Sequence, residues 1–519
     1  MNKLKICAAL LSLSTLFSCG CSKESNNYSS SILQQQEERK ASKGVSNKVD
    51  ATLYALENID NYKSINYDSD KIVIVCPEIF VGNAITAASD INEILSEKYE
   101  INKEVIFVGI DDTVSYQDKL SKYIDEGGQI DIISTGYNVS GYGAINHSCG
   151  TYQDFVDNGW LIDLTGYLNG SGGEQLKNIY SDRQWKSLSI NNKIYGVNGN
   201  QMLGNGQVLS FNTKVCEENG IDLADYDGSF KQIKEWCDII KSHNVDCDYF
   251  YGGISGISDI AELAGMLPDY QLASYGIGVY QTENGLKAVN IYEDGNVRKL
   301  ISELSDLYAS GYIFDPTVNE ASGVNLVMNV SSMYADGQTD ETTVTNKNWI
   351  TPYSQNVNNF VCGICALSED TDTAFKVLSA LYSDKDLSNL LQYGTDKISD
   401  ITEEQYESIY AMCSIGNNMI TFPNKFNGET DNKTVEIEEY NESVKDNPLL
   451  GFRLDLSKAD FNTLYEINSQ GENIFMGYCG DDWESCLNKI SEQLETAGIN
   501  KTIDEVNLQL EKFYESNPN

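Results

Sequence analysis

The sequence has 519 residues, of which 41% are apolar, so it is expected to form two or three packed domains rather than one core. It contains 36 Lys and Arg against 77 Asp and Glu, which gives a formal net charge of −41. Nucleic acid and anionic lipid both attract cationic surface, so this charge argues against either as a partner.

The first eighteen residues have the layout of a secretory signal. Lys3 and Lys5 provide a positive start, and Ile6–Phe17 is an apolar stretch too short to remain as a membrane-spanning helix. We therefore expect residues 1–18 to be an export signal and the rest of the chain to lie outside the cell.

The junction after this stretch, Leu16–Cys19, resembles the bacterial lipobox, in which the cysteine becomes lipidated and N-terminal. The resemblance implies a lipid anchor on Cys19 that holds the protein at the extracellular face of the cell membrane. Cys21 is a weaker second candidate, and an ordinary cleaved signal is the alternative. Several acyl chains on one cysteine would anchor the protein stably, whereas a single chain would not.

A polar linker follows, because residues 22–48 contain almost nothing that a folded core could bury. With the lipidated cysteine, the anchor and linker together span residues 19–48. A flexible coil of this length reaches roughly 30 Å, which would lift the folded body away from the membrane surface.

Strands and helices then alternate. The β-branched runs at 71–76, 105–108 and 130–134 predict buried strands. Apolar residues at helical spacing lie between them at 84–95 and 116–123. Such alternation predicts βαβ units and a mainly parallel sheet.

The same alternation returns after residue 190. Residues 207–212 and 360–367 are expected to be strands, and the stripes at 230–240 and 297–307 are expected to be helices. A long helix is expected from Phe375 to near Gly394, and the last element, 503–513, has one apolar face. The fold class is therefore α/β, with two lobes and a helical C-terminal part.

Cysteine, histidine and carboxylate residues give little support for chemistry. Ten of the 13 cysteines lie in the body, mostly within apolar runs, so buried thiols are favoured over disulfides. Cys362 and Cys365 would point to opposite faces of a strand, which argues against a redox or zinc motif. The only two histidines are far apart in the sequence, and we predict no metal, no cofactor and no catalytic residue.

Several segments, taken in order, resemble the extracellular solute-binding proteins of carbohydrate ABC importers, the maltose-binding-like class. The segments are 131–137, 159–168, 185–196, 208–214, 217–222, 370–378 and 390–394. Two more, Asn447–Phe452 and Glu505–Leu510, resemble a lipoprotein subfamily with an extra C-terminal domain. One turn departs from the subfamily, which has Tyr-Gly-Ile-Glu-Gly where this chain has Tyr393-Gly-Thr-Asp-Lys397.

The resemblance implies a two-lobed, periplasmic-binding-protein-like (type II) fold with a hinge. Lobe one would comprise residues 49–195 and 325–395. Lobe two would comprise 196–324 and 396–519, including the C-terminal extension. The implied function is capture of an extracellular carbohydrate, an oligosaccharide in our interpretation, between the lobes and its delivery to the permease subunits of an ABC importer.

Sugar hydroxyls pair with polar side chains and sugar C–H faces stack on aromatic rings, and both would come from loops at the carboxyl ends of the strands. The candidates for ligand binding are Thr135, Tyr137, Asn138, Tyr142, Asn198, Asn200, Gln201 and Trp349. Surface loops, a hydrogen-bonded turn and core packing are the alternative roles of these residues.

Two other functions remain open. A surface glycoside hydrolase would need paired carboxylates, and Asp481, Asp482 and Glu484 form the nearest cluster. A helix start with N-capping and dipole-complementing acids explains this cluster more simply. A binder of a peptide or another solute with the same fold is the third possibility.

Overall fold

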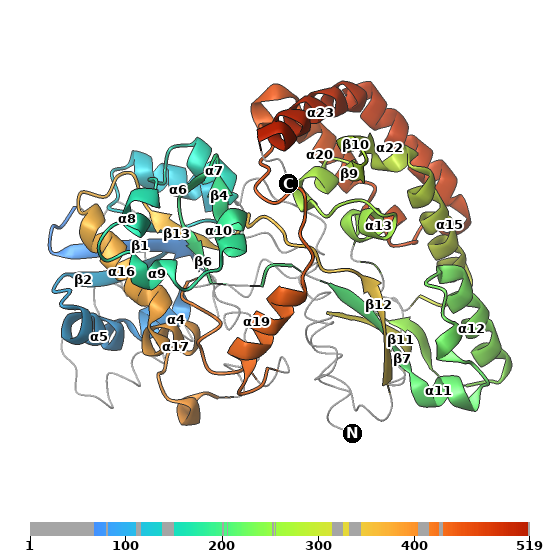
Figure 1. Ribbon diagram of the computed structural model, residues 1–519, viewed down its shortest axis with the longest axis horizontal. Coiled ribbons are helices and arrows are strands. Elements are labelled where there is room, and N and C mark those ends of the chain that lie inside the picture. Colours follow the sequence, from blue (N-terminus) through green and yellow to red (C-terminus); the bar gives the residue numbers. More distant parts are fainter. Residues whose placement is uncertain are drawn as a thin grey trace.

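The computed structural model places two lobes beside each other, with the N-terminal half of the sequence divided between them (Figure 1). None of the helices in the described part of the chain combines the length and apolar character that crossing a membrane requires. The structure describes residues 67–78, 81–110, 116–136, 150–199, 202–204, 206–245, 247–251, 254, 256–313, 325–331, 344–402, 415–424 and 429–516.

Lobe one is built on a five-stranded sheet of order β2-β1-β3-β13-β6. Its strands are β1 (Lys71–Pro77), β2 (Glu104–Ile110), β3 (Ile132–Ser134), β6 (Val197–Asn198) and β13 (Val361–Ile364). The first three are parallel, with Ile74 beside both Phe107 and Ile132. Strand β13 runs antiparallel to β3 and β6. The central strands are buried on both faces, as their continuous apolar runs predict.

Helices cover this sheet on both sides (Figure 1). The helix predicted from 375 to 394 is in fact two helices, because the Asp384 carboxylate accepts hydrogen bonds from Asp386 N and Leu387 N and so starts a new helix. The lobe-one helices are α4 (Gly82–Thr86), α5 (Ala88–Tyr99), α6 (Tyr116–Asp125), α7 (Tyr152–Asp157), α8 (Thr165–Asn169), α9 (Glu174–Lys177), α10 (Asp182–Leu188), α16 (Thr371–Ser383) and α17 (Lys385–Tyr393), with the hairpin β4 (Ser189–Ile190) and β5 (Lys193–Ile194).

Lobe two has a four-stranded sheet of order β12-β7-β11-β8. The strands are β7 (Gln207–Asn212), β8 (Asp248–Tyr251), β11 (Asn325–Ser331) and β12 (Val344–Ile350). Strand β7 pairs with β11 on one edge and β12 on the other. The prediction that residues from 325 belong to lobe one is therefore wrong, and the chain returns to lobe one only after β12.

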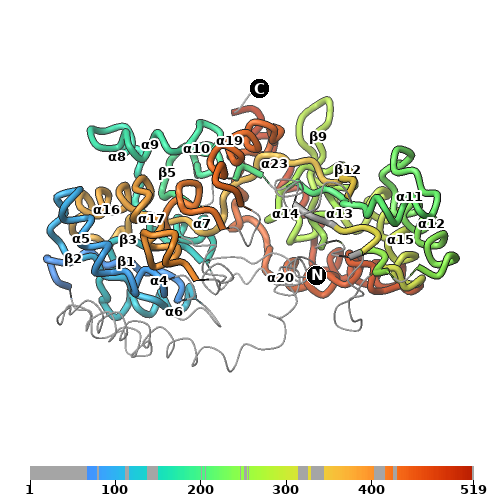
Figure 2. Tube along the Cα trace, turned by 90° about the horizontal axis from the view of Figure 1, so that it is seen from below, coloured from blue at the N-terminus to red at the C-terminus, as the bar shows by residue number. Residues whose placement is uncertain are grey.

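The C-terminal helices pack into the core of lobe two. Leu464, Leu487 and Leu510 are fully buried in the same core as Leu209 and Ile301. Figure 2 shows the two lobes side by side, with red C-terminal segments running along lobe two. Besides its four-stranded sheet, lobe two contains α11 (Thr213–Glu218), η4 (Leu223–Asp225), α12 (Phe230–Ser242), α13 (Ile257–Leu263), α14 (Tyr270–Ser274), β9 (Ile277–Thr282), β10 (Gly285–Asn290), η5 (Ile291–Glu293) and α15 (Gly295–Ala309). Its C-terminal elements are η9 (Leu456–Lys458), α20 (Phe461–Ser469), α21 (Glu472–Phe475), η10 (Gly480–Asp482), α22 (Trp483–Ala497) and α23 (Ile499–Ser516).

One part of the predicted C-terminal division differs. Residues 415–424 pack on lobe one, because Ile415 lies in its core and Asn417 N donates to Ser388 Oγ at 3.2 Å. The predicted boundary at 395 is therefore wrong as well. Two further elements complete the described set, η6 (Ile398–Asp400) and α19 (Lys433–Ser443).

Most of the described cysteines are buried, as their apolar contexts predict. Eight cysteines of the described chain are present as thiols, and six of them are buried in the two cores. Cys362 and Cys365 are both among the buried ones. A buried thiol of this kind behaves as a small apolar side chain.

Candidate functional site

In the part of the chain that the structure describes, three connections join the lobes, and they define the region where a ligand between the lobes would lie. The first, 199–206, leads from β6 to β7, and the second, 351–360, leads from β12 to β13. The third, 444–455, follows α19 and enters the C-terminal helices. Figure 1 shows these segments passing between the lobes.

The second and third connections are hydrogen-bonded to each other along their length. Lys445 N donates to Pro352 O at 2.9 Å, and Ser354 N donates to Lys445 O at 2.8 Å. Further along, Gly451 N donates to Asn356 Oδ1 at 2.7 Å. The two segments therefore form one paired unit rather than two independent linkers.

Arg453 ties this unit to lobe one. Its guanidinium donates to Ser187 O at 2.8 Å and Val357 O at 3.0 Å, and it also donates to the Asn358 side chain. It lies over the Tyr152 ring, 5.9 Å from the centroid. Burial lowers the pKa of Arg453 to about 10, so the side chain remains a cation at neutral pH.

The lobe-one edge of this region is formed by the carboxyl ends of β1, β3 and β6 and the start of β13. Thr135 directly follows β3, where the prediction placed it. Its hydroxyl accepts from Val361 N at 3.1 Å, and its side chain is fully buried. Thr135 therefore fastens β3 to β13, and it offers a ligand no exposed surface in this conformation.

The other predicted ligand-binding residues, apart from Trp349, are only partly covered by the structure. Asn198 is largely buried at the end of β6, and its carbonyl accepts from Tyr180 Oη at 2.7 Å. The remaining five candidates lie outside the described residues, so their roles stay predictions: Tyr137, Asn138, Tyr142, Asn200 and Gln201. The lipidation site, Cys19, also lies outside them.

Trp349 lies at the end of β12, half-buried in lobe two. Its ring packs edge-on against Phe230 and Phe250, with centroids 6.0 Å and 6.2 Å away. These contacts attach the ring to the core, and a stacking role for its remaining surface stays a prediction.

A loop of lobe one, residues 415–424, lies against the first connection. Asn418 N donates to Gly199 O at 3.1 Å, directly before the predicted ligand residues at 200 and 201. The loop is held from the lobe-one side by Asn389 Oδ1, which accepts from Phe422 N at 2.7 Å. Its position is therefore fixed next to the candidate site.

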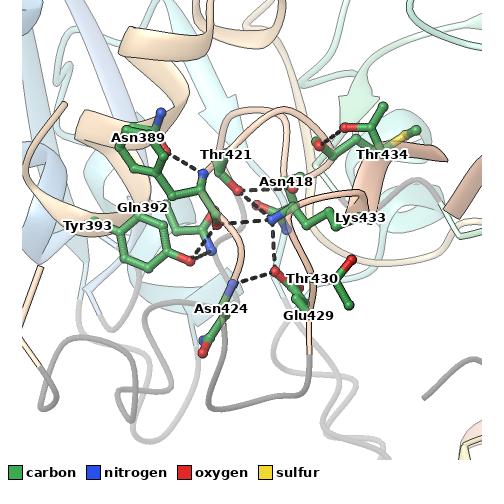
Figure 3. Close-up of polar contacts among 12 residues, drawn as sticks. Asn389, Gln392, Tyr393, Asn418, Thr421, Asn424, Glu429, Thr430, Lys433 and Thr434 are labelled. Carbon is green, nitrogen blue, oxygen red and sulfur yellow. Dashed lines mark hydrogen bonds and ion pairs between the residues drawn. The ribbon is translucent and has the colours of Figure 1, made fainter. Parts of the chain in front are cut away.

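A buried ion pair holds the other side of this loop (Figure 3). Lys433 Nζ, with its side chain 4% exposed, lies 2.9 Å from Glu429 Oε2. The same ammonium donates to Thr421 Oγ1 at 2.9 Å and Phe422 O at 3.2 Å. Burial lowers the pKa of Lys433, and the Glu429 carboxylate opposes that shift.

The lobe-two edge carries a group of acids that the sequence analysis missed. Gln207 Nε2, at the start of β7, lies 3.5 Å from Asp259 Oδ1 on α13. One turn further on α13, burial and then the Asp259 carboxylate raise the pKa of Glu262 to about 8. A small pocket is lined by Ser258, Ala261, Glu262, Leu267, Pro268, Asp269, Leu272, Ala273, Ile277, Gly278 and Val279.

These acids can form hydrogen bonds of both kinds. A neutral carboxyl donates one hydrogen bond and accepts others, whereas a carboxylate only accepts. A protonated Glu262 carboxyl can therefore both donate to and accept from the hydroxyl groups of a ligand. The pocket adjoins the third connection, because Asn447 Nδ2 donates to Pro268 O at 2.9 Å.

The carboxylates considered for hydrolysis lie elsewhere. Asp481, Asp482 and Glu484 are exposed at the start of α22. Asp482 occupies the N-cap position without a side-chain capping hydrogen bond, so only the dipole part of the expected explanation holds. No group of three or more His, Cys, Asp or Glu suited to a metal ion occurs among the described residues.

Comparisons with known proteins find similarity to this chain among solved structures. No family model matches the sequence, and no curated protein matches it. Among solved structures, the N-glycan transport solute binding protein NgtS from Streptococcus pneumoniae matches with a TM-score of 0.61 at 20% identity. The match covers 86% of this chain and 98% of that chain.

The chain has the two-lobed fold of a solute-binding protein. Structures of NgtS in complex with Man1GlcNAc and with Man5GlcNAc also match, each with a TM-score of 0.56 at 20% identity over 86% of this chain and 99% of that chain. The fold that the sequence resemblance implied is confirmed.

Within this solute-binding fold, Arg453 and Glu262 are the features that sequence reasoning missed. Arg453 directly follows the Asn447–Phe452 segment, which resembles a lipoprotein subfamily. The sequence therefore marked this region but did not indicate the role of Arg453. Glu262 stands in a short amphipathic helix and resembles an ordinary surface acid.

Proposed function

We propose that this protein is the substrate-binding component of an ABC importer and captures an extracellular carbohydrate between its two lobes. The observation that supports this most strongly is the likeness of nearly the whole fold to NgtS, whose complexes contain Man1GlcNAc and Man5GlcNAc. The acids at the lobe-two edge, with donors and acceptors in one place, suit hydroxyl recognition.

The mechanism is closure of the lobes around one ligand. A ligand that contacts both lobes only in the closed form shifts the open–closed equilibrium by its difference in affinity for the two forms. The paired second and third connections would bend during this motion. The closed form then presents the ligand to the permease subunits, and no covalent bond changes.

Calorimetry against a panel of oligosaccharides tests the proposal. The panel contains mannose–N-acetylglucosamine oligosaccharides, maltodextrins and chitin oligosaccharides, with short peptides as the contrasting set. We expect saturable binding of at least one oligosaccharide with one site per chain. Binding of a peptide and of no sugar would favour the alternative ligand class.

The glycoside hydrolase alternative is tested with the same sugars. We expect every bound oligosaccharide to be recovered intact after prolonged incubation. Release of shorter sugars by the wild type, abolished in a D481N/D482N/E484Q variant, would contradict a purely binding role.

We also propose that lipidation of Cys19 retains the protein at the cell membrane on its extracellular face. The Cys19→Ala change is expected to release the chain from the membrane fraction and abolish incorporation of labelled palmitate. A C21A variant serves as the control and should remain membrane-bound; retention of C19A with loss of C21A would move the anchor to Cys21.

A further inference from the structure

Two cysteines differ from the other six in the described part of the chain. Cys479 and Cys486 are half-buried, whereas the other described cysteines are buried within the two cores. A reagent in solution can reach a thiol at the surface but not one enclosed in a core. Cys479 and Cys486 are therefore the thiols of the described chain that a dissolved reagent can reach.

The two thiols are also in contact. The Cys479 side chain is hydrogen-bonded to that of Cys486, and burial together with this contact raises the pKa of Cys479 to about 12. The Cys479 sulfur is therefore held as the protonated thiol at neutral pH. The neighbouring Cys486 sulfur lies in the first turn of α22, near the positive end of the helix dipole, and it is the one that starts a reaction with an oxidant.

The backbone between them forms a compact turn. Cys479 precedes the 3-10 helix η10, and Asp482 N donates to Cys479 O at 3.1 Å. Cys486 lies in the first turn of α22. The turn brings the two side chains together without a long flexible loop. It is supported by α15, because the ring of Tyr478, just before the turn, lies 5.2 Å from the ring of Tyr308 on α15.

We propose that Cys479 and Cys486 form a disulfide when the exported protein meets a small-molecule disulfide as oxidant. The Cys486 thiolate attacks one sulfur of the oxidant, forming a mixed disulfide and expelling one small thiolate. Cys479 then loses its proton to solvent and attacks Cys486 Sγ, which expels the second small thiolate. Two protein thiols are oxidised to one disulfide, and one small disulfide is reduced to two thiols.

The bond would close a small ring around η10 and fasten this turn to α22. Cross-linking a short loop restricts the unfolded chain modestly, so a rise of roughly a few degrees in the Tm of lobe two is expected. Because closure needs the Cys479 thiolate, the second step should become faster as the pH rises.

The test uses the full chain and oxidised glutathione, with site-resolved mass spectrometry after alkylation. The wild type is expected to lose two hydrogens at the 479–486 pair, while the buried cysteines remain reduced in the same molecules. The C479S variant is expected to keep a glutathione adduct on Cys486, because it lacks the resolving thiol.

Three outcomes would overturn the proposal. Both thiols of the folded wild type could remain free for alkylation after oxidation. The wild type could retain the Cys486 adduct as C479S does. Cys479 could instead pair with a different cysteine, which the peptide map would identify.

Discussion

At the scale of single residues, buried charged side chains beside the connections contribute to the free energy of unfolding and to its dependence on pH. Lys433 is almost fully buried and is the first residue of α19. The positive end of the helix dipole at this N-terminus disfavours a cation. It is retained there by three oxygen acceptors, of which one is ionised. Removing either partner of such a pair leaves the other charge buried without compensation.

The Lys433→Met change is expected to lower the free energy of unfolding by about 3–5 kcal/mol, because Glu429 loses its buried counter-ion. The K433M/E429Q double variant should recover part of that loss. Urea unfolding measures both. K214M, which removes one partner of an exposed pair with Glu218, should change stability by less than about 1 kcal/mol; an equal loss in K214M and K433M would contradict this account.

The pH dependence of stability should include a contribution from Glu262. Its pKa in the folded protein, about 8, lies above the usual value of 4.5, so the folded state binds the proton more tightly. This contribution is fully present below about pH 4.5 and is lost as the pH rises through about 8.

Between pH 5.5 and 8.5 the wild type should therefore lose stability, on the order of 1–3 kcal/mol, that E262Q does not lose. Urea unfolding at both pH values measures the difference. E438Q, an exposed change on α19, should keep the wild-type dependence. The same dependence in E262Q as in the wild type would rule out Glu262 as its source.

At the scale of elements, the third connection depends on the shape of Arg453 as well as its charge. A guanidinium can donate to several acceptors in different directions, whereas a lysine ammonium is a single point. Arg453 uses this property to donate to the carbonyls of Ser187 and Ser189 in lobe one, and to the Val357 carbonyl and the Asn358 side chain in the second connection.

The Arg453→Lys change is expected to lower unfolding stability by about 2–4 kcal/mol and to speed proteolytic cleavage within 444–455, because backbone carbonyls lose their donors. Limited proteolysis with mass spectrometry locates the cuts. R298K is the matched control, because Arg298 makes one exposed hydrogen bond to Asn488. Unchanged cleavage in R453K would show that the connection is held by other contacts.

The elements themselves were largely predictable, and their assignment to lobes was not. Continuous apolar runs gave β1, β2 and β3, because buried parallel strands need them. The periodicity does not say which sheet a segment joins, and the residues from 325 that contain β11 and β12 were assigned to the wrong lobe from the resemblance. The break at Asp384 was foreseeable, because Ser-Asp before an amphipathic run is an N-cap pattern.

The site was less predictable because its parts are far apart in sequence. The hydrogen bond from Asn418 N to Gly199 O joins segments far apart in the sequence, and the lobe-two acids meet Gln207 only in the folded chain. Thr135 was located correctly at the end of β3, but its burial depends on β13, a strand more than two hundred residues away. Local sequence therefore identified positions near the site and not what their side chains do.

At the scale of the whole molecule, the C-terminal helices are part of the lobe-two core rather than an appended domain. Leu464, Leu487 and Leu510 lie in one core with residues from the first half of lobe two. A core of this kind cannot lose one side without exposing the rest.

A chain ending at Asp455 is expected to lose the fold of lobe two and keep that of lobe one, whose core is separate. Hydrogen exchange should show β7 unprotected and β1 protected. A chain ending at Ser516 is the control and should match the full-length protein. Protection of β7 in the shorter chain would mean that lobe two folds without α20–α23.

Three connections, two of them bonded along their length, also limit how the lobes can move. A pair of bodies joined at one flexible point can tilt, twist and slide in any direction. Adjacent tethers resist torsion and translation and leave bending across their common line as the soft coordinate. Opening and closing should therefore follow one path, so that distances between labelled positions on opposite lobes and on the same side of the connections would rise and fall together.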